Sequence, residues 1–188
     1  ENIDGVLICW SGYFDLHGGR ADADPARIGA RSILKRLQPL IRFLLEHDIP
    51  TFGICFGHQL IAESQGGCVV HDKEQSKWGT HNVALHENST DDDFFGVLPR
   101  LFEAQYGHND SVTELPIGAI VLAESPMCRF SVLRYGKHVY TTQFHPELSA
   151  SDMRARLQTM GAYLPHAATA ASQVRESEHA SDMLIAFI

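Results

Sequence analysis

A cysteine bracketed by glycines is the residue of this sequence best suited to act as a nucleophile. Cys55 stands in the motif Gly-Ile-Cys-Phe-Gly at residues 53–57, between an apolar run that starts at Ile49 and a run that continues to Ser64. Flanking glycines permit a sharp strand-to-helix turn, called the elbow below, in which the nucleophile adopts a strained conformation. The partial positive charge of a helix start favours a thiolate. The motif predicts a reactive thiol, whereas a glycine-bracketed cysteine taken alone can also be simple packing.

A histidine and a glutamate two residues apart are the natural partners for this cysteine, because a cysteine nucleophile needs a base and a group that orients it. His145 directly follows a strand-like run over residues 138–144, and Glu147 follows Pro146. In extended backbone, residues i and i+2 point the same way, so Glu147 can accept a hydrogen bond from one imidazole nitrogen while the other faces Cys55. The carboxyl ends of strands gather at one edge of an open α/β sheet, and we expect the two side chains to meet there.

Acyl transfer also requires donors for the oxyanion. The amide of Phe56, directly after the cysteine at the helix start, is the first candidate. The amide of Gly12, in the loop after the first apolar run, is the second, because glycine lets a carbonyl oxygen approach the backbone. An ordinary tight turn would explain Gly12 equally well.

The elements that must position these residues alternate early in the chain, and strands cluster in its middle. Apolar residues recur with helical spacing over residues 32–47, with an irregularity at Pro39, whereas residues 14–31 are predicted as a loop. The three aspartates at residues 91–93 are predicted to lie in a solvated loop. Strands are predicted at residues 3–10, 49–52, 68–70, 78–85, 101–106, 119–124, 129–134 and 138–144, and helices at residues 59–64, 153–160 and 167–188.

This order predicts an α/β fold with a mixed, mostly parallel central sheet flanked by helices. The length of 188 residues predicts a single domain over residues 1–188. A buried strand opens the sequence with no element before it to pair with, so we expect that an N-terminal strand and helix are missing from this chain.

Composition excludes several classes of function. The net charge is −8 and no run of Lys and Arg occurs, so no nucleic-acid partner is expected. No apolar run approaches the roughly 18 residues of a membrane span, and the first residues show no signal-peptide pattern, so no membrane partner is expected. The four cysteines lack metal-type spacing, the 11 histidines are scattered, and no metal or other cofactor is expected. Free thiols indicate a reducing, cytoplasmic location.

Four segments resemble, in order, those of a class I (triad) glutamine amidotransferase domain such as the stand-alone glutaminase domain of GMP synthase. They are residues 8–12, 53–59, 108–112 and 143–147. The resemblance implies a flavodoxin-like fold of the glutamine amidotransferase type and a catalytic triad of Cys55, His145 and Glu147. It also implies that Gly12 and Phe56 donate to the oxyanion.

The same resemblance implies that Gln59 contacts the bound glutamine, and that the backbone of the segment with His108, Asn109 and Asp110 holds the substrate's amino-acid end. One departure concerns the loop at residues 12–14, which reads Gly-Tyr-Phe where the family usually has Gly-Gly-Pro. This departure lies in the loop that would supply the second oxyanion donor, the amide of Gly12.

The function implied is hydrolysis of the side-chain amide of glutamine through a cysteine thioester, giving glutamate and ammonia for an acceptor or a partner synthetase. Two alternatives stay open. A γ-glutamyl peptide hydrolase would use the same first step on another γ-glutamyl compound. A binding or regulatory subunit would keep the scaffold without turnover.

Overall fold

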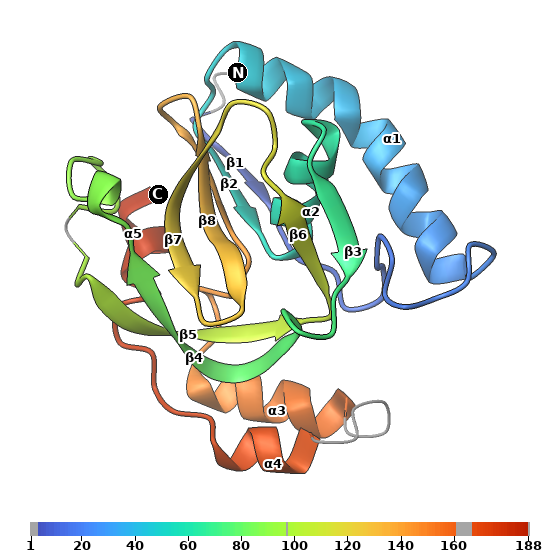
Figure 1. Ribbon diagram of the computed structural model, residues 1–188, viewed down its shortest axis with the longest axis vertical. Helices are drawn as coiled ribbons and strands as arrows, with labels where there is room; N and C mark the ends of the chain where they lie inside the picture. Colours follow the sequence, from blue (N-terminus) through green and yellow to red (C-terminus); the bar gives the residue numbers. More distant parts are fainter. Residues whose placement is uncertain (1–3, 97, 161–166, 188) are drawn as a thin grey trace.

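A mixed seven-stranded sheet forms the centre of the molecule, in the computed structural model that describes residues 4–96, 98–160 and 167–187 (Figure 1). The strand order is β1-β2-β9-β8-β7-β4-β5, and β3 and β6 pair in a separate small sheet. Strands β1, β2, β9, β7 and β5 run in one direction, and β8 and β4 run in the other. The predicted α/β class with a mixed, mostly parallel sheet is therefore confirmed. The strands are β1 (Val6–Ile8), β2 (Thr51–Ile54), β3 (Cys68–His71), β4 (Lys77–Leu85), β5 (Leu101–His108), β6 (Asp110–Glu114), β7 (Ala119–Ser125), β8 (Cys128–Tyr135) and β9 (Val139–Thr142).

Helices cover the sheet on several sides. In Figure 1, α1 runs along one side of the molecule, and α3 and α4 lie together beneath β4 and β5. Helix α2 packs against β2, the strand that precedes it. The helices are α1 (Pro25–Glu46), α2 (Phe56–Ser64), α3 (Ala150–Met160), α4 (Ala167–Ser172) and α5 (Asp182–Phe187), with a short 3-10 helix η1 (Glu87–Ser89).

The first helix starts earlier than the sequence pattern predicts, so the expected loop over residues 14–31 is wrong in its second half. The side chain of Asp24 accepts a hydrogen bond from the amide of Ala26 at 2.9 Å, and Pro25 occupies the first helical turn. An aspartate cap followed by proline is a strong helix start, and it outweighs the weak apolar periodicity of this segment. The helix continues through Pro39.

The two ends of the described chain also differ from the prediction. Of the strand predicted at residues 3–10, residue 3 lies outside the described residues, and β1 covers only Val6–Ile8 of the rest. The single helix predicted over residues 167–188 is two short helices, and residues 173–181 between them are not helical. The last helix does dock on the sheet as expected, because Phe187 contacts Phe52 with ring centroids 5.6 Å apart. Residue 188 lies outside the described residues.

The acidic stretch at residues 91–93 is not simply a solvated loop. Asp92 is buried, and it pairs with Arg134 on β8 at 2.5 Å. Its carboxylate also accepts hydrogen bonds from the amides of Phe94 and Phe95 at 3.0 and 2.9 Å. The charge is tolerated in the core because it is both paired and hydrogen-bonded.

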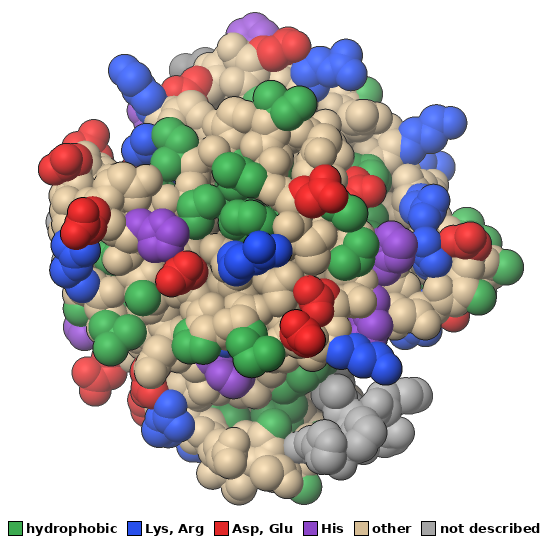
Figure 2. All heavy atoms as spheres, in the orientation of Figure 1, with side chains coloured by type: hydrophobic (Ala, Val, Ile, Leu, Met, Phe, Trp, Pro, Cys, Tyr) green, Lys and Arg blue, Asp and Glu red, His purple; other side chains and the backbone are tan. Residues whose placement is uncertain are grey.

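Charged groups of both signs are interspersed over the face drawn in Figure 2, and Lys and Arg do not gather into one patch on it. Within residues 4–96, 98–160 and 167–187, no helix combines the length and the apolarity needed to cross a membrane.

The contact between β1 and the start of α2 fixes the part of the fold that carries the elbow. A Cβ atom on Gly57 would lie 2.0 Å from the carbonyl oxygen of Ile8, which ends β1. Only glycine allows this approach. The end of β1 therefore rests directly on the first turn of α2.

We expect Gly57→Ala to destabilise the protein by about 2–3 kcal/mol or more, because the new methyl group meets a backbone carbonyl that cannot rotate away. Urea unfolding followed by circular dichroism measures the change. Gly5→Ala is the matched control, since a Cβ there meets its neighbours at an ordinary 3.4 Å. Equal unfolding midpoints for the two variants would contradict this account of the contact.

Candidate active site

The predicted elbow is present, and Cys55 occupies its strained position. Cys55 joins β2 to α2 with φ 50° and ψ −94°, a conformation that residues other than glycine rarely adopt. Such strain costs about 1–3 kcal/mol and persists only where the surroundings impose it. Here a Cβ on Gly53 would lie 3.0 Å from both Ile61 and Thr141, so the turn is enclosed on both sides.

The pairing of β2 with β9 brings His145 to the same edge of the sheet. Ile54 is in register with Thr142, and the amide of Cys55 donates to the carbonyl of Thr142 at 2.8 Å. Three residues later, the amide of His145 donates to the carbonyl of Gln105 on β5 at 2.7 Å. The backbone around His145 is thereby tied to two different parts of the sheet.

Glu147 lies where an orienting group is needed. His145 Nδ1 is 2.7 Å from Glu147 Oε1, as the i, i+2 geometry predicted, and the imidazole is fully buried. Burial lowers the pKa of His145, while the Glu147 carboxylate opposes that effect. A carboxylate on Nδ1 selects the tautomer whose proton is on that nitrogen, which leaves a lone pair on Nε2.

The thiol of Cys55 differs from the expectation drawn from the helix start. Burial raises its pKa to about 12, although the charge of Arg156 and the amide of Phe56 act in the opposite direction. Removal from water thus outweighs the partial charge of a short helix. In this arrangement Cys55 is a neutral thiol, whose sulfur accepts a long hydrogen bond from Gln143 Nε2 at 3.7 Å.

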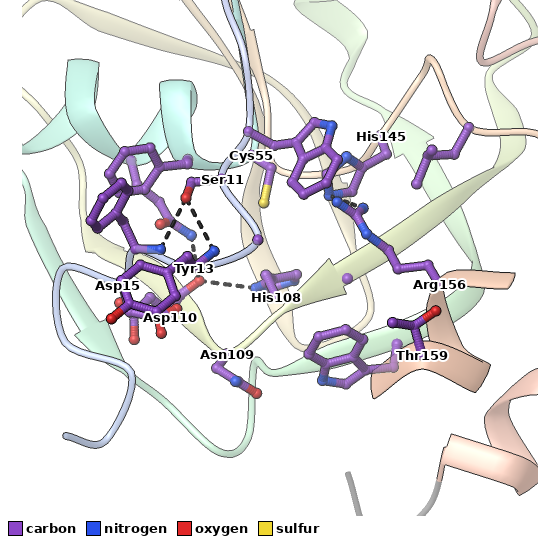
Figure 3. Close-up of a pocket in the computed structure, with 18 of the residues that line it drawn as sticks. Ser11, Tyr13, Asp15, Cys55, His108, Asn109, Asp110, His145, Arg156 and Thr159 are labelled. Atoms are coloured by element: carbon purple, nitrogen blue, oxygen red, sulfur yellow. Dashed lines mark hydrogen bonds between the residues drawn. The ribbon is translucent and has the colours of Figure 1, made fainter. Parts of the chain in front are cut away.

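A cavity of about 740 Å³ is lined by all of the predicted site residues except Glu147 (Figure 3). Cys55, Phe56 and Gln59 line it from the elbow, and His145 lines it from the end of β9. Several lining residues were not singled out from the sequence because they carry no motif and come from distant segments. These are Asp15, Arg20, Trp78, Asp152, Arg156 and Thr159.

Gly12 lies in the cavity wall, in the loop after β1. The hydroxyl of Ser11 accepts hydrogen bonds from the amides of Tyr13 and Phe14 at 3.2 and 2.9 Å, which fixes the turn around Gly12. The amide of Phe56 interacts with the sulfur of Cys55. Both residues that carry the candidate oxyanion donors therefore line the cavity, and the amide of Phe56 lies next to the sulfur.

The predicted substrate-binding residues lie at the cavity but are engaged with one another. Gln59 donates through Nε2 to the carbonyl of Asp110 at 2.7 Å, and His108 Nδ1 is 3.0 Å from the same carbonyl. The Asp110 carboxylate accepts from the amides of His17 and Gly18 at 2.7 and 2.6 Å. Its charge therefore holds the loop before α1 in place.

Two histidines near this segment are neutral. Burial lowers the pKa of His108 to about 3, and the Nε2 of His108 has no hydrogen-bond partner among the described residues. Burial likewise lowers the pKa of His58 to about 3. The remaining predicted residue, Asn109, lines the cavity and receives a hydrogen bond from the hydroxyl of Ser76 at 3.3 Å.

Arg156 on α3 enters the cavity beside the histidine. Its guanidinium lies 3.5 Å from the centroid of the Trp10 ring, and its Nη1 is 3.3 Å from His145 Nε2. Figure 3 shows Arg156 extending from its helix toward His145. The arginine thus contacts both the loop after β1 and the histidine.

A strained cysteine at a strand-to-helix elbow, a histidine–glutamate pair at the next parallel strand end, and a backbone amide beside the sulfur are typical of α/β enzymes that cleave amides through a cysteine.

Comparison with known proteins narrows this class to a family. The family model for glutamine amidotransferase class-I matches residues 25–161, which include Cys55, His145 and Glu147. The chain belongs to this family, and it is a cysteine-dependent glutamine amidotransferase.

Two relatives and one solved structure illustrate the match. The glutamine-hydrolysing GMP synthase subunit of Archaeoglobus fulgidus is 34% identical over 137 residues, covering 72% of this chain and 73% of the relative. The protein of the same name from Methanothermobacter thermautotrophicus is 34% identical over 128 residues, covering 68% and 67%. The crystal structure of a glutamine amidotransferase from Thermotoga maritima superposes with a TM-score of 0.73 at 21% identity, covering 100% of this chain and 97% of that one.

We expect Glu147→Gln to lower kcat for glutamine hydrolysis by about 100- to 10,000-fold, because the neutral amide no longer fixes the imidazole tautomer. Burial places the acid limb of the wild-type pH–rate profile below the ordinary histidine value near 6.5, since His145 must be unprotonated to act as base. Glu147 raises this pKa, so its removal moves the limb to still lower pH.

A coupled assay of glutamate formation across pH measures both effects, with Glu46→Gln, an exposed residue at the end of α1, as control. A limb that moves to higher pH in Glu147→Gln would contradict the assignment.

Proposed function

We propose that Cys55, His145 and Glu147 perform the glutamine hydrolysis that defines the family. The observation that carries this assignment is that the strained Cys55 and His145 line one cavity, while Glu147 Oε1 lies 2.7 Å from His145 Nδ1. The γ-carboxamide of glutamine is an uncharged group that suits a nucleophile buried away from water.

These three residues suffice to account for every proton that moves in the reaction. Cys55 transfers its proton to His145 Nε2, and the sulfur attacks the amide carbon of glutamine. His145 returns the proton to the departing nitrogen, which leaves as ammonia with formation of a γ-glutamyl thioester. Water then attacks the thioester while His145 takes one of its protons and returns it to the sulfur, which releases glutamate and regenerates the thiol.

The amides of Phe56 and Gly12 stabilise the negative oxygen of the tetrahedral intermediates. Both belong to backbone that the fold holds in place, so they need no reorganisation as charge develops. The Gly-Tyr-Phe sequence at residues 12–14 keeps glycine at the donor position even though it departs from the usual family loop.

We propose further that the ammonia serves the synthesis of GMP on a separate synthetase protein. The support is that both relatives described above carry the name of a glutamine-hydrolysing GMP synthase subunit. The identity of the acceptor rests on these relatives.

We expect Cys55→Ala to abolish release of ammonia from glutamine while Cys68→Ala retains it, because Cys68 lies on β3, outside the cavity. A glutamine-analogue electrophile should label Cys55 in the folded wild-type protein, as read by peptide mass spectrometry. Absence of label, or activity retained in Cys55→Ala, would overturn the assignment.

Running γ-glutamyl peptides beside glutamine separates the two substrate classes, and a preference for the peptides would identify a γ-glutamyl hydrolase.

We expect GMP to form from glutamine nitrogen when the protein is combined with the GMP-forming synthetase of its own organism, and to depend on Cys55. Replacing glutamine by ammonium salt should restore GMP formation with the Cys55→Ala variant. Glutamine hydrolysis without GMP formation, under conditions where ammonium supports it, would assign the ammonia to a different acceptor.

A further inference from the structure

Arg156 is bonded to the nitrogen of His145 that must accept the proton of Cys55 in the proposed reaction. In the tautomer set by Glu147, His145 has one nitrogen lone pair left, on Nε2. A guanidinium has only donors, so the contact of 3.3 Å between Arg156 Nη1 and Nε2 uses that lone pair. The thiol of Cys55 requires the same lone pair to give up its proton.

The hydrogen bonds of the two reacting groups agree with this view. Within the described parts of the chain, no hydrogen bond joins Cys55 to His145. The sulfur instead accepts from Gln143 Nε2 at 3.7 Å, and the imidazole lies between Glu147 and Arg156. Cys55 is thus bonded to Gln143, and His145 Nε2 is bonded to Arg156.

The guanidinium is held in place by more than this one bond. It stacks on Trp10 with 3.5 Å between the guanidinium carbon and the ring centroid, and Trp10 in turn packs edge-on against His145 with centroids 5.9 Å apart. The other arginine in the cavity wall, Arg20, pairs with Asp15 and Asp24, whereas Arg156 forms no ion pair within 4 Å to any described carboxylate. Stacking on an aromatic face is a preferred arrangement for arginine and leaves its fork free to donate.

Charge alone does not explain a useful role for Arg156 in the proton transfer. Its positive charge lowers the pKa of the Cys55 thiol, which favours the thiolate, and lowers the pKa of His145, which opposes the imidazolium. The transfer depends on the difference between the two pKa values, so these effects oppose each other. The hydrogen bond to Nε2 has no such counterpart and acts only against the transfer.

We propose that Arg156 is a positioning residue that restrains the general base: its guanidinium, seated on Trp10, holds His145 Nε2, and glutamine hydrolysis proceeds when the guanidinium moves off this nitrogen and Cys55 takes its place. The inference rests on the proposed roles of Cys55 and His145. It links α3, the loop after β1 and the end of β9 through one side chain, so a movement of any of the three changes the availability of the base.

The test measures the rate at which iodoacetamide alkylates Cys55 in the full chain, read by peptide mass spectrometry. Arg156→Met keeps an unbranched stem for Trp10 and removes both the donors and the charge. We expect alkylation about 3- to 10-fold faster than in wild type, the factor that corresponds to one net hydrogen bond. Arg154→Met is the control, because Arg154 lies on the same helix, does not line the cavity and donates to the carbonyl of Val174.

Arg156→Lys separates geometry from charge. Lysine keeps the positive charge but lacks the planar fork that spans Trp10 and Nε2. We expect its alkylation rate to follow Arg156→Met. A rate equal to wild type would show that charge, not the hydrogen bond, controls the thiol and would overturn the proposal.

The pH dependence of alkylation supplies a readout that a purely structural role would leave unmoved. Glu147 and Arg156 are the charged groups that act on His145, His108 lies close enough to interact with it, and Cys55 and Asp152 line the same cavity. Because Arg156 lowers the pKa of His145, Arg156→Met moves the acid limb to higher pH, and Arg156→Lys moves it less far because the positive charge remains.

Slower alkylation in Arg156→Met, or an unchanged rate with an unchanged limb, would overturn the proposal. Thermal unfolding of each variant identifies any that fail to fold, and Arg156→Lys then decides the matter. Since alkylation does not involve glutamine, a wild-type protein that alkylates at Cys55 but releases no ammonia contradicts the proposed function separately.

Discussion

The close contact between Gly57 and the carbonyl of Ile8 is the constraint on which the arrangement of the site depends. The space for a single Cβ is missing, so the end of β1 lies directly against the first turn of α2. That contact places the loop carrying Gly12 beside the helix start carrying Phe56. Gly12 and Phe56, from segments more than 40 residues apart, thereby line the same cavity as Cys55.

The second constraint is the register between β2 and β9. Parallel strands end at the same edge, and the pairing of Ile54 with Thr142 sets how far His145 lies beyond that edge. The further bond from the amide of His145 to Gln105 ties this segment to β5. Because β5 ends at His108, next to Asp110 at the start of β6, this bond connects the segment that carries His145 to the segment predicted to bind the substrate.

Local chemistry explains what the sequence could predict, and contacts between distant segments explain the rest. The elbow at Cys55 and the His145–Glu147 pair are short motifs whose geometry follows from neighbouring residues, and the structure has both as predicted. The start of α1 is marked by a local cap at Asp24, which is a better guide there than apolar periodicity. The burial of Asp92, in contrast, is tolerable only because it pairs with Arg134 on β8, and the sequence around residue 92 does not predict that partner. Arg156 likewise reaches the cavity because α3 folds back beneath β4, a tertiary placement with no local motif.

The protonation state of Cys55 likewise depends on how the whole fold buries it. A helix start argues for a thiolate, yet burial raises the pKa of Cys55 to about 12 and lowers that of His145, so both groups are neutral in this arrangement. A neutral pair is stable in a dry cavity, where separated charges would be costly. It becomes reactive only when thiol and imidazole share a proton, and that step requires Nε2 to be free. The residue bound to Nε2 therefore governs reactivity more directly than the pKa of either group alone, and in this protein that residue is Arg156.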